Sequence, residues 1–400
     1  MSRIIHYLAS DSLKGRGNGS PELLKAGIFI GDEFKKNNLK PFPGFPSYFI
    51  SFNPFGGPKK TIRDSLIWNG GLISPEDFVY VHPRPGGYKA KKLADFTIIK
   101  WDSCFPADIL KRFSDDTTSL LIWTDKKQAD GNSFLPEEVK TPVGGLTRDI
   151  LLVYADSGPV SLLLLGNRSF YSMVEYNVVG ILPGKTKPNE VIIFSAHYDH
   201  MGEYSFGKDR ILNGANDDAS GTTAVLALAN YFSKRNDNER TIMFCVFAGE
   251  EMGLLGSGDF VPYIDPAKVI AGINIEMIGI PEFGKGKVFI TGERYSSLPE
   301  ILSKGLKRSG ISVRPDPDEK KNLFLRSDNY PFNLQGVPFH TIMASDDDDE
   351  CYHQPCDEVN RIDIANMTRI IKAIAASSVL LINGQATPTR IDPGGIQRND

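Results

Sequence analysis

Imidazole and carboxylate side chains follow several short apolar runs in the middle of this 400-residue chain. The candidates for chemistry are His197, Asp217, Glu250, Glu251, Glu276 and His353. Two imidazoles and several carboxylates are the ligand mix that suits zinc and similar divalent ions. Two neighbouring ions need one bridging carboxylate and roughly one histidine and one acid each, and this set supplies them. We therefore predict a two-metal site that activates water and polarises a carbonyl, with one further carboxylate to move the proton.

The elements that must position these residues begin with two short apolar runs that we interpret as buried strands. His197 and Asp199 follow the run 191–196. They face the same way on an extended chain because they are two residues apart. The run 241–248 repeats this design and leads to Glu250. We expect both runs to lie in one sheet and to present their polar residues at its edge.

The segment between these two runs is predicted to be a helix that begins beside an acidic pair. Asp217 lies just before residues 222–232, whose apolar positions recur with a helical period. Strands that alternate with helices predict an α/β layered fold. In such folds the site forms at the carboxyl ends of adjacent strands, so we expect the candidates to converge there.

Each of these signals is weak when taken alone. A His-x-Asp after a strand is more often a polar turn, a Glu-Glu pair beside glycine is usually a solvated loop, and an Asp-Asp pair before a helix is usually an N-cap. Glu276 differs, because it ends an apolar run where an unpaired carboxylate would be costly. The metal-site hypothesis rests on the joint placement of all the candidates at strand ends.

Composition argues against several classes of partner. The formal net charge is −4, so no basic field favours nucleic acid or an anionic membrane. The apolar runs are too short to predict a membrane span, and no segment has the pattern of a signal peptide. We expect a natural leader to have been trimmed, which favours an exported protein, periplasmic or secreted, over a cytoplasmic one. The oligomeric state stays open.

The four cysteines are too few for a disulfide scaffold. Cys245 lies inside an apolar run and is predicted to be a buried thiol. Cys351 and Cys356 leave two alternatives open: a disulfide that closes a small loop and favours an oxidising compartment, or two free thiols.

Five motifs resemble those of a known family in their order along the chain: AHYDH, NGANDDASG, FAGEEMGLLGS, NIEMIG and CYHQPCDE. The family is that of the M28 zinc exopeptidases, the aminopeptidase-type co-catalytic metallopeptidases. The resemblance covers about 177–383, with a softer likeness at YLASDSLKGRGNGSPE near the N-terminus. It implies a three-layer α/β/α fold with a mixed, largely parallel central sheet, and zinc as the cofactor, with two ions per chain.

The resemblance also implies a role for each matching residue. The metal ligands would be His197, Asp217, Glu251, Glu276 and His353, with Asp217 as the bridge. Asp199 would orient His197, and Glu250 would be the general base.

Three positions near the motifs are open to more than one interpretation. Glu276 stands where the family usually has aspartate, so the metal spacing and the occupancy of its site stay open. Tyr352 resembles a tyrosine whose hydroxyl steadies an oxyanion, and a tyrosine that packs under the loop is the alternative. His200 is expected to be a surface imidazole, and a place behind the metal ligands is the alternative.

The distribution of apolar runs and of Gly, Pro and Asp along the sequence predicts four regions. They are an N-terminal helical region of the peptidase domain (1–58), a mostly β inserted or accessory module (59–169), the zinc peptidase core (170–386) and a poorly packed tail (387–400). The module is predicted from short apolar runs separated by Gly, Pro and Asp.

We therefore expect a zinc-dependent exopeptidase, an aminopeptidase that removes N-terminal residues from a peptide substrate. A metal-bound hydroxide would attack the carbonyl, with Glu250 as general base and then as proton donor to the leaving amine. Three alternatives stay open: a carboxypeptidase of the same fold, a glutaminyl cyclase-like acyltransferase with a single zinc, and a non-catalytic binding protein. Intact His197 and Glu276 argue against the single-zinc enzyme.

Overall fold

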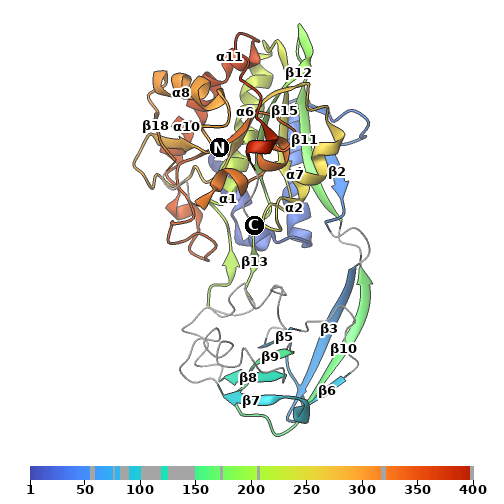
Figure 1. Ribbon diagram of the computed structural model, residues 1–400. Coiled ribbons are helices and arrows are strands. Elements are labelled where there is room, and N and C mark those ends of the chain that lie inside the picture. Colours follow the sequence, from blue (N-terminus) through green and yellow to red (C-terminus); the bar gives the residue numbers. More distant parts are fainter. Residues whose placement is uncertain are drawn as a thin grey trace. The chain divides into compact units, whose positions relative to one another are not determined.

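The chain forms two compact units in this computed structural model. Unit 1 comprises Met1–Pro54, Val174–Glu203 and Ile211–Asp400, and unit 2 comprises Phe55–Met173 and Tyr204–Arg210. Both termini belong to unit 1 (Figure 1). Unit 2 includes the predicted module and also Tyr204–Arg210, which the sequence analysis assigned to the core. The residues that the structure describes are 1–54, 59–74, 77–81, 90–100, 119–124, 149–171, 174–204, 208–316 and 321–396.

A mixed sheet of nine strands runs through unit 1 (Figure 1). The strand order is β1-β11-β15-β12-β16-β19-β17-β18, and β2 pairs with β11. The central strands β15, β12, β16 and β19 are parallel, whereas β1, β2 and β15 each run antiparallel to β11, and β17 runs antiparallel to β19. The bounds are β1 Lys40–Pro41, β2 Phe49–Phe52, β11 Glu175–Leu182, β12 Lys187–His197, β15 Arg240–Phe247, β16 Val269–Ile275, β17 Lys287–Ile290, β18 Ser312–Arg314 and β19 Phe339–Met343.

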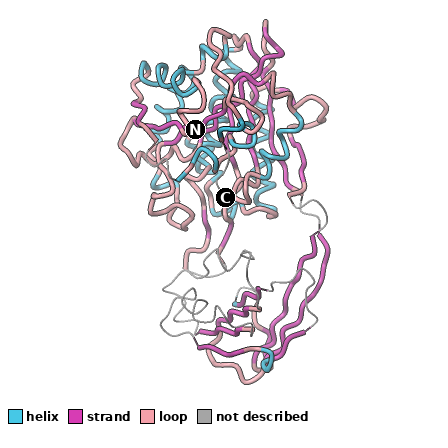
Figure 2. Tube along the Cα trace, in the orientation of Figure 1, coloured by secondary structure: helices cyan, strands magenta, loops and turns pink. Residues whose placement is uncertain are grey.

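Helices cover both faces of this sheet (Figure 2). Ile192 and Phe194 of β12 pack in one core with α1, α2, α6, α8 and α10. Ile193 points to the opposite face, where it packs in a second core with α7 and α9. The prediction of an α/β/α fold with a mixed, largely parallel sheet is confirmed. The helix bounds are α1 Ser2–Leu8, α2 Pro21–Lys36, α6 Ala219–Arg235, α7 Leu255–Phe260, α8 Leu298–Arg308, α9 Tyr330–Asn333, α10 Ile364–Ser377 and α11 Val379–Ile382.

Burial of both sheet faces explains why the central strands read as continuous apolar runs. Every residue of β15 is buried, and the rings of Phe194 and Phe244 stack with centroids 5.9 Å apart. Phe194 also stacks on Phe232 of α6 at 5.8 Å. Each such side chain contributes about 1.5–3 kcal/mol to the free energy of unfolding when fully buried. The strands that carry the candidate site are therefore held by a buried aromatic core.

Side-chain caps fix where several helices begin. Ser20 accepts a hydrogen bond from the backbone N–H of Leu23 at 3.1 Å at the start of α2. Asp218 does the same for Gly221 at 2.9 Å at the start of α6. The α6 cap matters for the site, because it fixes the residue directly after Asp217.

The N-terminal region is not only helical. Two short strands, β1 and β2, join it to β11 of the main sheet. The prediction of an N-terminal helical region over residues 1–58 is wrong for these two strands. A short apolar stretch such as Phe49–Phe52 pairs with a strand that is distant in the sequence, and local pattern gives no sign of that partner.

Unit 2 is mostly β in its described residues. One sheet has the order β4-β3-β10-β6 and the other β5-β9-β8-β7. Leu66 and Leu164 from the first sheet and Leu121 and Leu151 from the second belong to one buried core. The strand bounds are β3 Lys59–Trp68, β4 Gly71–Leu72, β5 Phe78–Val81, β6 Ala90–Lys92, β7 Thr97–Lys100, β8 Leu120–Thr124, β9 Ile150–Tyr154 and β10 Leu162–Tyr171.

The tail predicted to be poorly packed is packed as far as Ile396. Ile391 and Ile396 are buried in a cluster with Phe324 and Leu325. The guanidinium of Arg390 donates to the carbonyl of Val269 at 2.7 Å. The prediction is wrong here because two isoleucines in a Pro- and Gly-rich segment suffice to anchor it. Residues 397–400 lie outside the described residues.

One helical stretch of the described chain, 364–382, is long and apolar enough to cross a membrane, with a mean hydropathy of 1.4. More than half of it is buried inside the folded chain, where Ile370 and Ile374 of α10 pack in the main core. A core helix accounts for this composition. The absence of a membrane span stays a prediction.

Candidate metal centre

The candidate residues converge at one edge of the central sheet. The strands β12, β15, β16 and β19 are parallel, so their carboxyl ends meet at the same edge. His197 is the last residue of β12, and Glu276 directly follows β16. Glu250 comes shortly after β15, and His353 lies in the loop that follows β19. Residues far apart in the sequence are thus brought together by strand direction alone.

Two sets of possible metal ligands share one carboxylate. Within each set, the ligand atoms all lie within 4.8 Å of one another. The first set contains His197, Asp217 and Glu276, and the second contains His200, Asp217, Glu251 and His353. All five predicted ligands are therefore found in these sets, and His200 is an addition.

Asp217 directs one oxygen toward each set. Its Oδ1 lies 3.2 Å from Nε2 of His197, and its Oδ2 lies 3.2 Å from Nε2 of His353. Burial would raise the pKa of Asp217, but the imidazoles of His197 and His353 hold that pKa well below its usual range. An ionised carboxylate with one oxygen on each side is the geometry that a bridging ligand requires.

The backbone around Asp217 is fixed by two other carboxylates. Asp357 accepts the N–H of Asn216 at 2.9 Å and that of Asp217 at 3.1 Å. Asp218, joined to Asp217 by a cis peptide bond, accepts the N–H of Met277 at 3.2 Å in addition to its α6 cap. The loop before α6 is therefore tied to the end of β16 and to the segment after His353.

His200 is buried, so the prediction of a surface imidazole is wrong. Its Nδ1 lies 2.8 Å from Oε1 of Glu251 and 3.8 Å from Oδ2 of Asp217. The other carboxylate oxygen of Glu251 lies 3.1 Å from Nε2 of His353. Gly214, with φ of +55°, leaves room for the His200 ring, because a Cβ there would come within 2.6 Å of it. Sequence reasoning missed His200 because only the tertiary fold brings Glu251 over it.

Asp199 contacts the site differently from its predicted role. Its Oδ1 lies 3.7 Å from Nδ1 of His197, too far for a hydrogen bond. The ring nitrogen instead lies 3.2 Å from the Asp199 backbone carbonyl. The carboxylate accepts the backbone N–H groups of Glu250 at 3.2 Å and Glu251 at 3.3 Å, and the side-chain amide of Asn18 at 2.8 Å. Asp199 therefore positions the acidic pair more directly than it positions His197.

Glu276 is held by a polar pair that sequence reasoning did not identify. Its Oε2 accepts a hydrogen bond from the hydroxyl of Ser327 and another from the amide of Asn274 at 3.4 Å. Ser327 precedes Asp328, a buried residue whose pKa burial raises to about 7. These contacts fix the longer glutamate arm, so its carboxylate still falls within the first ligand set.

Glu250 is half-buried beside both sets. Burial, reinforced by the carboxylates of Glu276 and Glu251, raises its pKa well above the usual range, against the pull of His197. A carboxyl of raised pKa can both accept and return a proton near neutral pH. This is the protonation behaviour expected of the predicted base.

Tyr352 lies on the same side of the site. Its ring stacks on that of His353, with centroids 3.8 Å apart, and it lines a cavity together with Asp217, Glu250 and Glu276. Burial, with the charges of Asp217 and Glu251, raises the pKa of Tyr352, so that its hydroxyl stays protonated. The oxyanion role stays a prediction, since Tyr352 also packs against the cluster around Met277.

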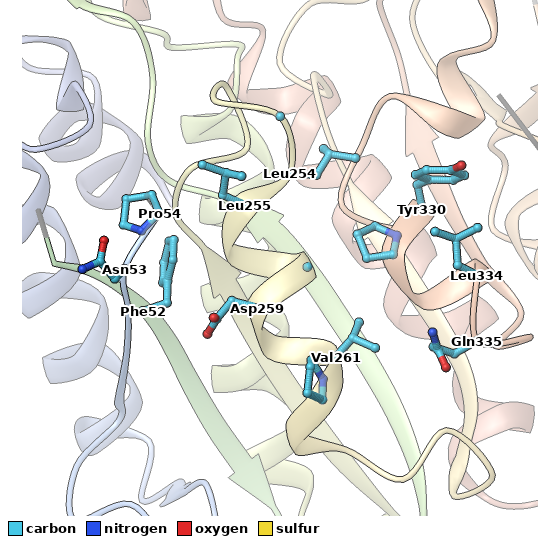
Figure 3. A pocket seen from close by; sticks show the side chains of 14 residues that line it. Phe52, Asn53, Pro54, Leu254, Leu255, Asp259, Val261, Tyr330, Leu334 and Gln335 are labelled. Atoms are coloured by element: carbon cyan, nitrogen blue, oxygen red, sulfur yellow. The ribbon is translucent and has the colours of Figure 1, made fainter. Parts of the chain in front are cut away.

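A broader hollow of about 600 Å³ lies alongside α7 and is separate from the donor sets (Figure 3). Phe52, Leu255 and Tyr330 contribute to its wall, and Asp259 is its acidic side chain. None of the candidate ligands lines it. The loop that leads from Glu250 into this hollow is held by the N–H of Gly253, which donates to the Glu250 carbonyl at 2.9 Å.

The residues present fit zinc. The Nε2 atoms of His197 and His200 are buried and make no hydrogen bond among the residues that the structure describes. The Nε2 atom of His197 faces the carboxylate of Asp217, and the Nδ1 atom of His200 faces those of Glu251 and Asp217. Buried polar atoms are costly unless they are paired or bind a metal, and imidazole with carboxylate is a donor mix that zinc accepts. Fold and donor sets together define an α/β metallohydrolase-type centre.

The chain belongs to Peptidase family M28. The model of this family matches residues 177–378, half of the chain, including every predicted ligand and the predicted base. The prediction of the family is therefore confirmed.

Curated relatives match the chain over a fraction of their length. It is 28% identical over 243 residues to leupeptin-inactivating enzyme 1 of Streptomyces exfoliatus, covering 55% of this chain and 50% of that protein. It is 28% identical over 215 residues to an aminopeptidase of Pseudomonas aeruginosa, covering 47% and 38%. The chain thus spans half the length of these relatives or less.

Solved structures share the fold over nearly the whole chain. BSAP, a zinc aminopeptidase from Bacillus subtilis, superposes with a TM-score of 0.64 at 16% identity, covering 96% of both chains. An aminopeptidase from Aneurinibacillus sp. strain AM-1 gives a TM-score of 0.59 at 17% identity, covering 99% of this chain and 95% of that one.

Proposed function

We propose that this chain is a zinc-dependent exopeptidase of the aminopeptidase type, which releases N-terminal residues from peptides. The observation that carries the proposal is the pair of donor sets sharing Asp217, with half-buried Glu250 beside them. The names of the relatives, aminopeptidase and zinc aminopeptidase among them, support the same activity.

We propose two zinc ions per chain. His197, Asp217 and Glu276 would hold one, and Asp217, Glu251 and His353 the other, with His200 beside Glu251. When bound, zinc supplies a Lewis acid that polarises a carbonyl and lowers the pKa of water. The first set supplies all three of its donors, which favours two ions over one.

The proton-transfer work belongs to Glu250. Its raised pKa suits it to take a proton from the attacking water and return it to the leaving amine. Tyr352, protonated and on the wall of the same cavity, can donate a hydrogen bond to charge that develops on the substrate oxygen.

The cavity beside the donor sets suggests where the substrate side chain lies. Met277, Leu323 and Met343 form an apolar section of its wall, and Arg326 pairs with Asp347 at 2.9 Å on the polar section. Methionine side chains adapt to irregular apolar groups. We therefore expect apolar N-terminal residues without a branch at Cβ, such as methionine and leucine, to be hydrolysed best.

The test is zinc content per chain, measured beside hydrolysis of peptides with a free N-terminus and of acetylated peptides with a free carboxyl end. About two ions and release of amino acids from the free substrates alone would support the proposal. Hydrolysis of acetylated peptides from the carboxyl end would instead support a carboxypeptidase. One ion with cyclisation of N-terminal glutamine would overturn the proposal in favour of the cyclase.

We further propose that the protein is exported. Cys351 and Cys356 form a disulfide in the loop that carries His353, and disulfides persist in oxidising compartments. Alkylation of the native purified chain should spare these two thiols until a reductant is added. Immediate labelling of both would remove this support for export.

A further inference from the structure

Arg16 is among the largest fully buried side chains in the described part of the chain, and it lies against the candidate centre. Its guanidinium donates to four backbone carbonyls. Nε donates to Tyr198 at 2.7 Å, Nη1 to Leu8 and to Asn213 at 2.7 Å, and Nη2 to Gly214 at 3.0 Å. One side chain thus joins three segments that are far apart in the sequence.

Two of these segments carry the metal-site residues. Tyr198 stands between His197 and Asp199, so the Arg16 bond fixes the turn at the end of β12. Asn213 and Gly214 lead directly into the loop that ends at Asp217. The guanidinium therefore fixes the backbone beside His197 relative to the backbone that leads to Asp217.

The backbone next to Arg16 strengthens this connection. The N–H of His200 donates to the Arg16 carbonyl at 3.2 Å, and Asn18 donates to the Asp199 carboxylate at 2.8 Å. Gly15, with φ of +67°, has no space for a side chain, because a Cβ there would lie 2.3 Å from the carbonyl oxygen of Gly202. Residues 15–18 therefore pack directly against the candidate metal centre.

The charge of Arg16 has no direct partner. Among the described residues it makes no ion pair, and all its hydrogen bonds go to carbonyls. Burial lowers its pKa, while the charges of Asp217, Asp357 and Asp199 oppose that shift. A buried cation is costly unless it is compensated, and the acidic centre is what compensates this one.

We propose that Arg16 is a positioning residue of the metal centre, which holds the loops of His197 and Asp217 at the separation that zinc requires and places a permanent positive charge behind their carboxylates. The inference rests on the proposed function. Only arginine has a planar fork with enough donors to reach carbonyls of three segments at once, whereas lysine has a single ammonium.

The experiment compares zinc affinity in metal-free protein, titrated against a competing chelator dye, for the unchanged chain, Arg16→Lys and Arg16→Met. Arg240→Met is the matched control. Arg240 is also buried and donates to two backbone carbonyls, of Leu381 at 2.8 Å and Ala386 at 2.7 Å, but it lies at the start of β15, away from the site. Thermal unfolding of each metal-free variant measures the loss of stability separately.

We expect Arg16→Met to lower zinc affinity by about 10–100-fold, the range seen when residues behind metal ligands are changed. Arg16→Lys keeps the charge but not the planar fork, so its zinc affinity should lie between that of Arg16→Met and that of the unchanged chain. If Arg16→Met does not fold, Arg16→Lys alone tests the inference. Arg240→Met should unfold at a lower temperature and bind zinc as the unchanged chain does.

Unchanged zinc affinity in folded Arg16→Lys and Arg16→Met would overturn the inference. An equal loss of affinity in Arg240→Met would also overturn it, because general destabilisation would then explain the effect. If the unchanged chain binds no zinc, the proposed function fails and this inference fails with it. Zinc binding without peptidase activity in the unchanged chain would overturn the proposed function alone.

Discussion

The carboxylate of Asp199 accepts the backbone N–H of Glu250, with 3.2 Å between Oδ1 and the amide nitrogen. Its second oxygen accepts the N–H of Glu251 at 3.3 Å. One buried side chain at the end of β12 thereby fixes the backbone of the proposed base and of a proposed ligand, both of which follow β15. This hydrogen bond between the ends of β12 and β15 therefore fixes the backbone position from which the Glu250 side chain extends.

Asp199→Asn should reduce kcat by about 10–100-fold, because an amide can accept only one of the two N–H groups and Glu250 or Glu251 loses its anchor. Steady-state kinetics with an aminoacyl amide would measure this. Asp363→Asn is the matched control, since Asp363 accepts an N–H at 2.9 Å at the start of α10, away from the site. Equal kinetics for Asp199→Asn and the unchanged chain would contradict the positioning role.

Glu250→Gln should keep zinc and lose turnover. The amide has nearly the shape of the carboxyl but cannot carry the proton from water to the amine, so we expect kcat to fall by at least about 10²-fold, the lower end for general acid–base catalysis. Metal analysis and kinetics on the same sample separate the two effects. Full activity in this variant would show that another group is the base.

His353→Ala should lower zinc content toward one ion per chain, because it removes a donor that faces both Asp217 and Glu251. His200→Gln should weaken the same site less, by about 10-fold, since Oε1 of Glu251 loses its neighbour at 2.8 Å. Zinc titration of both variants gives the comparison. His340→Gln is the control for His200→Gln. His340 is as buried as His200, but its ring nitrogens hydrogen-bond to Thr291 and Ser296 and not to a candidate ligand. An unaffected second ion in His353→Ala would place that site elsewhere.

Glu175 makes stability depend on pH. Burial raises its pKa from 4.5 to about 7, while the N–H of Gly19 donates to it at 2.6 Å. Between these two values the unfolded chain releases a proton that the folded chain keeps. The contribution of this group to stability is therefore complete below about pH 4.5 and is lost as the pH rises through about 7.

Glu175→Gln should remove that dependence, because the amide still accepts from Gly19 and does not ionise. We expect it to raise the free energy of unfolding by up to about 3 kcal/mol at pH 8, and by little at pH 4. Denaturant unfolding at the two pH values would measure the difference. Glu33→Gln should have the opposite effect and lower the free energy of unfolding at pH 8. Arg3 and Lys36 hold the pKa of Glu33 below its usual value against the effect of burial, so the charged carboxylate stabilises the fold at that pH. A gain that is equal at both pH values would contradict the assignment.

The sequence alone determined the features of the protein that follow from local pattern. The apolar runs of β12 and β15 are buried on both faces, so they are continuous enough to be recognised as strands. Parallel strands end at one edge, and the polar residues that end them had to meet there. For this reason the candidates could be named as one set before any contact was known, whereas the roles of ligand and base came from the resemblance to the M28 family.

Only the tertiary structure decided the residues that act through contacts distant in sequence. His200 reads as a surface imidazole until the loop after β15 brings Glu251 over it. Ser327 and Asn274 carry no motif signal, yet together they hold the arm of Glu276. Arg16 lies 182 residues before Tyr198, the carbonyl through which it reaches the end of β12. Such partners are set by how the segments pack, and no periodicity or spacing within one segment encodes them.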